Sequence, residues 1–226
     1  MSVKLLALDT AGTRCSVALL LDGKLAELDA PAERVQAESV LPMVEKLLAD
    51  AGLKLTALDA IAFGRGPGAF TGLRVATSVA QGLAYGSGLP VIPVSDLAAL
   101  AAAAVRLHQA ERIMACLDAR MHEVYWAAYE ARAGEILPLS EEALSPPSEV
   151  SAPSAAAWFG AGPGWAAYGE ALKARVPRLT GTDPSLLPTA GDIARLGEAA
   201  LRKGQKLPPE QALPVYLRDK VATPKA

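Results

Sequence analysis

The residues best suited to chemistry lie in a glycine-rich segment that runs from Gly64 to Arg74. A helix that begins after such a loop, with Thr71 as its cap, could hold an anion on free backbone N–H groups. The segment lacks the Gly-Lys-Ser/Thr ending of a P-loop, so the residues themselves favour the alternative, a tight strand-to-helix turn. The glycine-loop residues that force this turn and allow close backbone approach are Gly64, Gly66, Pro67, Gly68 and Gly72.

Other patterns that carry chemistry are missing from the sequence. The two histidines, His108 and His122, have no second His or Cys at metal-ligand spacing. No G-x-S-x-G elbow or H-E-x-x-H pair occurs. Cys15 and Cys116 follow or lie within apolar runs and are expected to be reduced, buried thiols. The sequence therefore predicts neither a metal site nor a catalytic nucleophile.

Composition predicts a globular protein that stays in the cytosol. The 226 residues are 51% hydrophobic and 20% charged, which is enough for a buried core. With 22 Lys and Arg against 24 Asp and Glu, nucleic acid would be contacted mainly through another chain. The N-terminal apolar run reaches Asp9 too soon for a signal peptide. Polar and glycine breakers interrupt the uncharged stretch between Arg74 and Asp96, so no membrane span is predicted.

The elements that position the glycine loop are short strands and amphipathic helices. Three strands come first, joined by turns that contain glycine, at Val3–Asp9, Cys15–Leu21 and Lys24–Leu28. Helices and strands then alternate through a helix from about Val35 to Asp50, strand Ala60–Gly64, helix Thr71–Tyr85, strand Val91–Val94 and a helix capped by Ser95.

The second half repeats this order more faintly. Its predicted elements are strands Ile113–Asp118, Glu123–Glu130, Ile136–Leu139 and Ala157–Phe159, and helices Trp165–Arg175 and Asp192–Lys203. We therefore predict an α/β protein with a two-lobed actin-like (ASKHA, ribonuclease H-like) fold and duplicated βββαβαβα lobes. An N-terminal lobe, residues 1–108, would carry partner-binding helices, and residues 109–226 would form a smaller C-terminal lobe.

Two turns test whether such a fold could bind a nucleotide. An actin-like ATPase needs a glycine-bearing turn after the acidic strand end in both lobes, so that two backbone loops clasp the phosphates. The turn after Asp9 contains Gly12, whereas the turn from Asp118 to Met121 contains no glycine. Asp9, Thr10 and Gly12 are therefore interpreted as a vestigial nucleotide loop, and ATP hydrolysis is expected to be weak or absent.

Two neighbouring helices are more apolar than a single lobe requires. Opposite the sheet-facing side of the helix after the glycine loop, small and apolar residues stand where a surface helix normally carries charge. In the preceding helix, apolar residues cover an arc wider than the ~100° of one core face. We predict a partner interface at Val40, Met43, Val44, Leu47, Val75, Val79, Gly82 and Gly86. The alternative is that the two helices merely pack on each other.

Several of these segments together resemble the TsaB (YeaZ) family, the dimerisation subunits of the bacterial tRNA threonylcarbamoyladenosine machinery. The glycine-loop signature is the most specific of them, and the matches run from one end of the chain to the other. They are Leu6–Thr10, Leu41-Pro42, Gly66–Arg74, Ala80–Ala84, Leu117–Arg120, Glu123–Tyr125 and Pro214–Arg218.

The resemblance implies a non-catalytic subunit, a degenerate relative of the catalytic subunit TsaD. It implies pairing with TsaD through a helical bundle, admission of the ATPase TsaE, and a homodimer when the chain is alone. The assembly would transfer a threonylcarbamoyl group to the adenosine beside the anticodon of tRNAs that read codons beginning with A. This chain would meet tRNA only through that complex.

The resemblance also bears on cofactors. Two metal-binding histidines of TsaD correspond to Asp96 and Leu100 here, so no metal is expected, and a nucleotide is expected only at the subunit junction. The residues leave one other function open, an ATP-dependent small-molecule kinase or ATPase of the actin-like superfamily, motivated by Asp9, Gly12 and the repeated lobe. A peptidase finds no nucleophile–base pair or metal site in the sequence.

Overall fold

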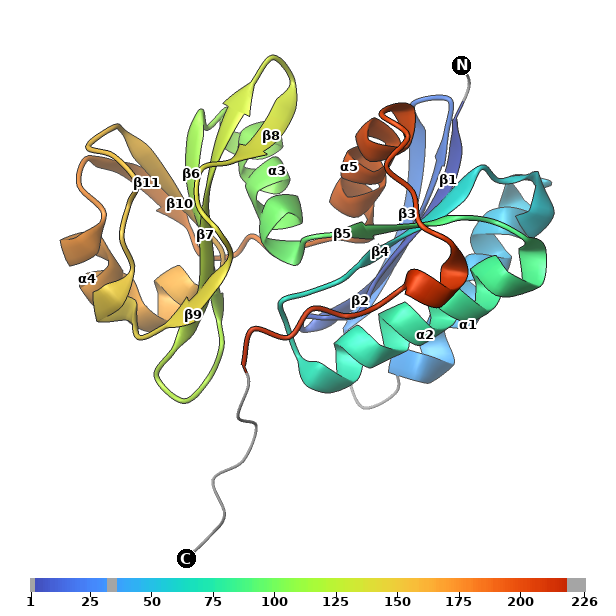
Figure 1. Ribbon diagram of the computed structural model, residues 1–226, viewed down its shortest axis with the longest axis horizontal. Coiled ribbons are helices and arrows are strands. Elements are labelled where there is room, and N and C mark those ends of the chain that lie inside the picture. Colours follow the sequence, from blue (N-terminus) through green and yellow to red (C-terminus); the bar gives the residue numbers. More distant parts are fainter. Residues whose placement is uncertain (1–2, 32–35, 219–226) are drawn as a thin grey trace, which may run out of the picture.

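The computed structural model describes residues 3–31 and 36–218, except for the side chains of residues 36 and 37. Each half of the chain builds its own sheet (Figure 1). The first sheet has the order β3-β2-β1-β4-β5, with β1 at Lys4–Asp9, β2 at Arg14–Leu21, β3 at Lys24–Pro31, β4 at Ala60–Gly64 and β5 at Val91–Val94.

The second sheet repeats the first. Its order is β11-β10-β6-β7-β8, and β9 pairs with β7. In each sheet, three antiparallel strands continue into two parallel ones. This repeat confirms the predicted two-lobed actin-like fold. The strands are β6 (Arg112–Asp118), β7 (Val124–Arg132), β8 (Glu135–Pro138), β9 (Ala143–Ser145), β10 (Trp158–Ala161) and β11 (Leu179–Asp183).

Helices cover both faces of each sheet. On the first sheet, Leu6 and Leu8 pack toward α1 (Gln36–Asp50) and α2 (Phe70–Ser87), because strand side chains alternate between faces. Leu5 and Ala7 face the other way, toward α5 (Ala190–Arg202). The second sheet lies between α3 (Asp96–His108) and α4 (Gly164–Arg175). Three short 3-10 helices, η1 (Leu55–Ala57), η2 (Pro147–Glu149) and η3 (Pro209–Gln211), complete the fold.

The lobes exchange their last helices. α3 follows the first sheet in the chain, yet Leu97 and Leu100 are buried with Ile113 in the second lobe. α5 follows the second sheet, yet Ile193 is buried with Leu5 in the first. The two helices lie side by side between the sheets (Figure 1). This packing corrects the predicted division into residues 1–108 and 109–226, because α5 and the segment after it return to the first lobe.

Two local predictions also need correction. Residues 139–157 of the second lobe form β9 and η2 at the place where the first lobe has α1. Pro146 and Pro147 in this segment oppose a helix, because proline lacks a backbone N–H and clashes with the preceding turn. The second lobe is therefore not βββαβαβα. α2 begins at Phe70 with Ala69 as its N-cap, so Thr71 is a helical residue rather than the cap. The predicted cap of α3 is confirmed, since the Ser95 side chain accepts a hydrogen bond from Ala98 N.

The cysteines and the membrane prediction can also be compared with the structure. Cys15 and Cys116 are both free and buried, as predicted. Desolvation, with a smaller contribution from the nearby Asp9 charge, raises the pKa of the Cys15 thiol to about 11. Within residues 3–31 and 36–218, no helix combines the length and hydropathy that a bilayer span requires.

A buried carboxylate joins the exchanged helices. Arg106 of α3 donates to Asp192 of α5 through Nε at 3.0 Å and Nη2 at 2.9 Å. Asp192 is fully buried, and its own backbone N–H donates to the capping hydroxyl of Thr189. A forked ion pair of this kind fixes orientation as well as distance.

Asp192→Ala should therefore lower the free energy of unfolding by about 1–3 kcal/mol, because it removes the acceptor of a forked Arg hydrogen bond and a first-turn carboxylate. Urea unfolding followed by circular dichroism measures this loss. Glu198→Ala is the matched control, since it breaks the more exposed Arg202–Glu198 pair of the same helix and should change stability by less than about 0.5 kcal/mol. Equal effects of the two variants would contradict the role given to Asp192.

Candidate functional site

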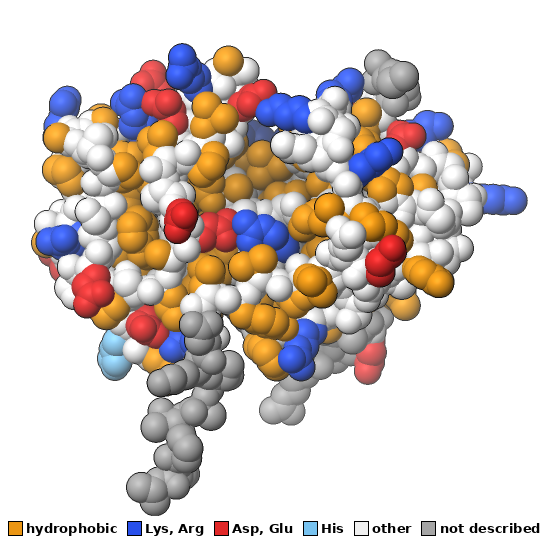
Figure 2. Space-filling view, viewed as in Figure 1, with side chains coloured by type: hydrophobic (Ala, Val, Ile, Leu, Met, Phe, Trp, Pro, Cys, Tyr) orange, Lys and Arg blue, Asp and Glu red, His pale blue; other side chains and the backbone are white. Residues whose placement is uncertain are grey.

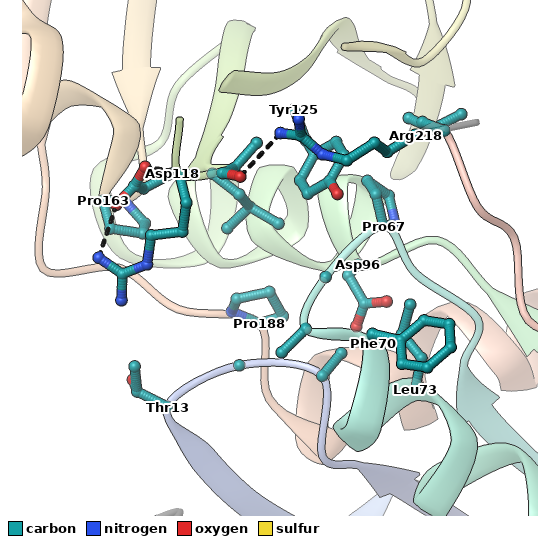
Figure 3. Close-up of a pocket in the computed structure, with 18 of the residues that line it drawn as sticks. Thr13, Pro67, Phe70, Leu73, Asp96, Asp118, Tyr125, Pro163, Pro188 and Arg218 are labelled. Atoms are coloured by element: carbon teal, nitrogen blue, oxygen red, sulfur yellow. Dashed lines mark hydrogen bonds and ion pairs between the residues drawn. The ribbon is translucent and has the colours of Figure 1, made fainter. Parts of the chain in front are cut away.

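A cleft of about 710 Å³ lies between the two lobes. Its walls are the β1–β2 turn, the glycine loop, the β6–β7 turn, the first turn of α4 and residues 215–218. Figure 2 shows apolar side chains in the hollow between the lobes, and Figure 3 shows Pro67, Pro163 and Pro188 from three different segments of the wall. This volume is within the range of small-molecule sites, about 300–1,000 Å³.

The glycine loop packs directly on the turn after β1. A Cβ on Gly68 would lie 2.7 Å from the carbonyl oxygen of Ala11, and a Cβ on Gly72 would overlap the carbonyl oxygen of Thr10. Two hydrogen bonds join the same segments: Thr10 Oγ1 donates to Gly72 O at 2.6 Å, and Ala69 N donates to Ala11 O at 2.8 Å. These contacts favour the tight-turn interpretation of the loop over anion binding.

Two carboxylates meet above Gly64 at the base of this contact. A Cβ on Gly64 would lie 2.6 Å from Asp96 Oδ1 and 3.0 Å from Asp9 Oδ1, so glycine is required there. Asp9 Oδ1 accepts from Ala11 N at 2.8 Å, and Asp96 Oδ2 accepts from Gly66 N. Asp9 is 2% exposed and Asp96 is 0% exposed. The glycine-loop backbone therefore already has a buried carboxyl group as its hydrogen-bond partner.

Burial raises the pKa values of both carboxyls. Burial raises the pKa of Asp9 to about 6. Burial, and next the charge of Asp9, raise the pKa of Asp96 well above its ordinary value. Among the described residues, no N–H or neutral hydroxyl donates to Asp96 Oδ1, which leaves a carboxyl proton as the group that can bridge it to Asp9. Like-charged carboxylates this close cannot both ionise easily, which is why the charge of Asp9 raises the pKa of Asp96 further.

The β6–β7 turn adopts a glycine-like conformation without glycine. Arg120, Met121 and His122 all have left-handed backbones, with φ values of 60°, 54° and 61°. Asp118 Oδ1 supports the turn by accepting from Arg120 N at 2.8 Å. The sequence suggested that this turn could not close without a glycine. The structure corrects this, because the turn closes with three non-glycine residues in the left-handed conformation. Three successive left-handed residues have no sequence signature beyond an Asp that can form an Asx-turn.

Burial corrects part of the predicted partner interface. Val40, Val44 and Leu47 are 0%, 4% and 5% exposed and belong to the first-lobe core, so a partner cannot reach them. The wide apolar arc of α1 faces both the sheet and α2, which is the alternative that the sequence left open. Met43, Val75 and Val79 are half-buried against the same core.

An exposed stripe nevertheless runs along α2. We call it the α2 stripe; it comprises residues at intervals of four, Phe70, Arg74, Ser78, Gly82 and Gly86, all of them exposed. Tyr85 of the same helix, at 77% exposure, was not among the residues predicted from the sequence, and Leu41, which belongs to the apolar arc of α1, is 45% exposed. The available sequence signal for Tyr85 was a large aromatic residue between two small ones, Ala84 and Gly86.

The side chains that could bind a metal are dispersed among the residues that the structure describes. In the described part of the chain, no three His, Cys, Asp or Glu side chains gather as metal ligands. Of the two positions that the resemblance aligns with a metal-binding pair, Asp96 opens α3 beside Asp9, and Leu100 is buried in the second-lobe core.

Comparison with known proteins assigns the family. A family model described as TsaD, tRNA N6-adenosine threonylcarbamoyltransferase, matches residues 30–226. The tRNA threonylcarbamoyladenosine biosynthesis protein TsaB of Haemophilus influenzae is 41% identical, over 97% of this chain and 95% of its own length. This chain belongs to the TsaB family. The Escherichia coli TsaB is 39% identical over 97% of this TsaB-family chain and 96% of its own length.

A solved structure agrees with this assignment across almost the whole molecule. The protein named YeaZ from Pseudomonas aeruginosa superposes with a TM-score of 0.89 at 51% identity. The match covers 95% of this chain and all of the solved one, 100%. The exchange of helices and the glycine-loop contact therefore belong to a TsaB-family structure rather than to a separate fold.

The raised pKa of Asp96 in this TsaB-family chain predicts how its stability depends on pH. A carboxyl whose pKa is raised on folding stabilises the fold at low pH, and this contribution is lost as the pH rises through the folded pKa. Asp96→Asn keeps a donor to Asp9 without a titrating group. The variant should match wild type near pH 4 and exceed its free energy of unfolding by about 1–3 kcal/mol at pH 8.

Urea unfolding at pH 4, 6 and 8 measures this difference. Asp50→Asn, an exposed change on α1, is the matched control and should differ from wild type by the same small amount at every pH. An Asp96→Asn variant that loses stability relative to wild type as the pH rises would show that the pair is not protonated.

The glycine contact can be tested with alanine. Gly72→Ala should destabilise the TsaB-family chain by at least about 2–3 kcal/mol, since the methyl group would overlap the Thr10 carbonyl. Gly82→Ala is the control within the same helix; at Gly82 the space within 4 Å of a new Cβ is free of described atoms, and it should stabilise by about 0.5–1 kcal/mol. Thermal unfolding measures both, and a neutral Gly72→Ala would contradict the contact.

Proposed function

We propose that this TsaB-family chain is a non-catalytic docking subunit in the biosynthesis of threonylcarbamoyladenosine in tRNA. Its partner would be a catalytic TsaD-type subunit, and the α2 stripe would be the docking surface. The observation that carries the proposal is the exposed stripe itself, together with the exposed Tyr85 on the same helix. Beyond Arg74 the stripe carries no charge, whereas a surface helix of a chain that acts alone would normally carry several charged residues there.

The small residues of the stripe support a close helix–helix contact. Gly82 and Gly86 are exposed, and a Cβ built on either would meet no described atom within 4 Å. The distance between packed helices depends on the side chains at the contact, so these glycines allow a partner helix to approach the backbone of α2. Tyr85 beside them offers the large, partly polar kind of anchor that dominates many interfaces.

The non-catalytic part of the proposal is supported by the base of the cleft. The turn after β1, which is one of the two turns that would have to clasp a phosphate, is instead bonded to the glycine loop through Thr10, Ala11 and Gly72. The ionised member of the Asp9–Asp96 pair adds negative charge at the same place, which opposes a polyphosphate. A group-transfer reaction would then belong to the partner.

The remaining partners follow from the family and the charge. We propose that the ATPase TsaE joins the complex and that tRNA is bound through the complex rather than by this chain alone. We also propose that the chain alone forms a homodimer through the α2 stripe. A net charge of −2 gives no general attraction for tRNA. A role in tRNA modification places the chain in the cytosol.

Gly82→Glu tests the docking surface without disturbing the fold. Glutamate is a better helix former than glycine, and its Cβ meets open space. The variant should keep the wild-type circular dichroism spectrum but bind the TsaD-type subunit at least about 30-fold more weakly, because a charge would enter the centre of the interface.

Isothermal titration calorimetry of the TsaD-type subunit against each variant measures the dissociation constant. Gly169→Glu is the matched control, since Gly169 lies on α4 of the second lobe and also has open space around its Cβ; it should bind like wild type. Unchanged affinity of Gly82→Glu would rule out the α2 stripe as the docking surface.

A further inference from the structure

The last described segment of the chain, residues 207–218, connects features that are far apart in the sequence. We call it the strap. In Figure 1 it is the red segment that runs along α2 toward the second lobe. It begins at an antiparallel bridge, where the backbones of Leu207 and Val91 exchange hydrogen bonds of 2.8 and 2.9 Å. Gln81 of α2 then donates to Pro209 O at 3.1 Å.

The strap reaches the beginning of the α2 stripe through Tyr216. The Tyr216 and Phe70 rings are 5.5 Å apart between centroids, and Arg74 lies 3.9 Å over the Phe70 ring. Arg74 Nε also donates to Tyr216 Oη at 3.1 Å. Phe70 and Tyr216 are each 43% exposed, so a partner on the stripe would cover this cluster.

The strap is also tied to the glycine loop. Val215 N donates to Arg65 O at 2.7 Å, and a Cβ on Gly66 would lie 2.9 Å from Val215 O. Arg65 itself crosses to the second lobe, where its two terminal nitrogens donate to Glu142 at 3.1 and 2.9 Å. A displacement of the strap would therefore disturb the wall of the cleft.

The strap ends on the β6–β7 turn of the second lobe. Arg218 Nη2 donates to Ala119 O at 2.9 Å, and Arg218 Nη1 lies 2.6 Å from Glu123 Oε2. These side chains are 17% and 27% exposed, so the ion pair is partly shielded from water. Figure 3 shows Arg218 reaching across the cleft toward this turn. The turn is the one that holds three left-handed residues, a conformation that needs support from its surroundings.

We propose that the strap couples the α2 stripe to the β6–β7 turn, so that a partner covering the stripe orders the cleft wall of the second lobe. The inference rests on the proposed function, which supplies the partner. Covering the Arg74–Tyr216 contact removes water from it and strengthens it, which opposes opening of the strap. Arg218 then stays on the turn for a larger fraction of time. The coupling is reciprocal, because linkage requires both sites to affect each other equally.

Hydrogen exchange followed by mass spectrometry tests this coupling in the full chain. Peptides that cover residues 119–123 are compared between the chain alone and the chain saturated with the purified TsaD-type subunit. In wild type, the subunit should slow exchange in the turn by about fivefold or more. In Arg218→Ala and in Glu123→Gln, which remove the ion pair from either side, the subunit should change exchange by less than about twofold.

Arg112→Ala is the matched control, because it removes an Arg–Glu pair of similar length, 2.7 Å to Glu130, away from the strap; its response should equal that of wild type. A complex that forms without slowing exchange in the turn would overturn the coupling alone. Protection that persists in Arg218→Ala would also overturn it, since the strap would not be the route. Failure to form any complex would overturn the proposed function and the coupling with it.

Discussion

The contact between the β1–β2 turn and the glycine loop determines what the cleft can do. Gly72 is close enough to Thr10 that a side chain cannot fit, and Ala69 and Ala11 share a backbone hydrogen bond. The loop is thereby held at the start of α2, which fixes where the exposed stripe begins. The same contact uses backbone groups that a bound phosphate would need for its own hydrogen bonds. One packing constraint thus limits the cleft and positions the surface proposed for docking.

The carboxyl pair above Gly64 completes this constraint. Asp9 ends β1 in the first lobe, whereas Asp96 opens α3, the helix that crosses to the second lobe. The buried carboxyl pair therefore lies where the lobes meet. The Arg106–Asp192 pair between the exchanged helices and the Arg218–Glu123 pair at the strap join the lobes at two other places. Lobes connected in this way suit a protein that presents a fixed surface to a partner.

Much of this architecture could be predicted from the sequence, because local patterns determine it. Strand β4 at Ala60–Gly64, strand β5 at Val91–Val94 and the Ser95 cap were predicted to the residue, since apolar runs and a capping hydroxyl are local signals. The burial of Val40 could not be predicted, because a wide apolar arc looks the same whether a partner or α2 covers it. Three other features could not be predicted, because they depend on packing between residues far apart in the sequence and so produce no periodic sequence pattern. They are the exchange of α3 and α5, the Asp9–Asp96 pair and the Arg218 contact.

The account can be tested most directly by titrating ATP–Mg²⁺ into the purified chain in a calorimeter. If the turn and the glycine loop are engaged with each other, and the ionised member of the Asp9–Asp96 pair repels phosphate, no binding heat should appear below about millimolar nucleotide, which corresponds to about −4 kcal/mol. Micromolar binding with turnover would contradict the account and favour a kinase or ATPase that uses the cleft between the lobes.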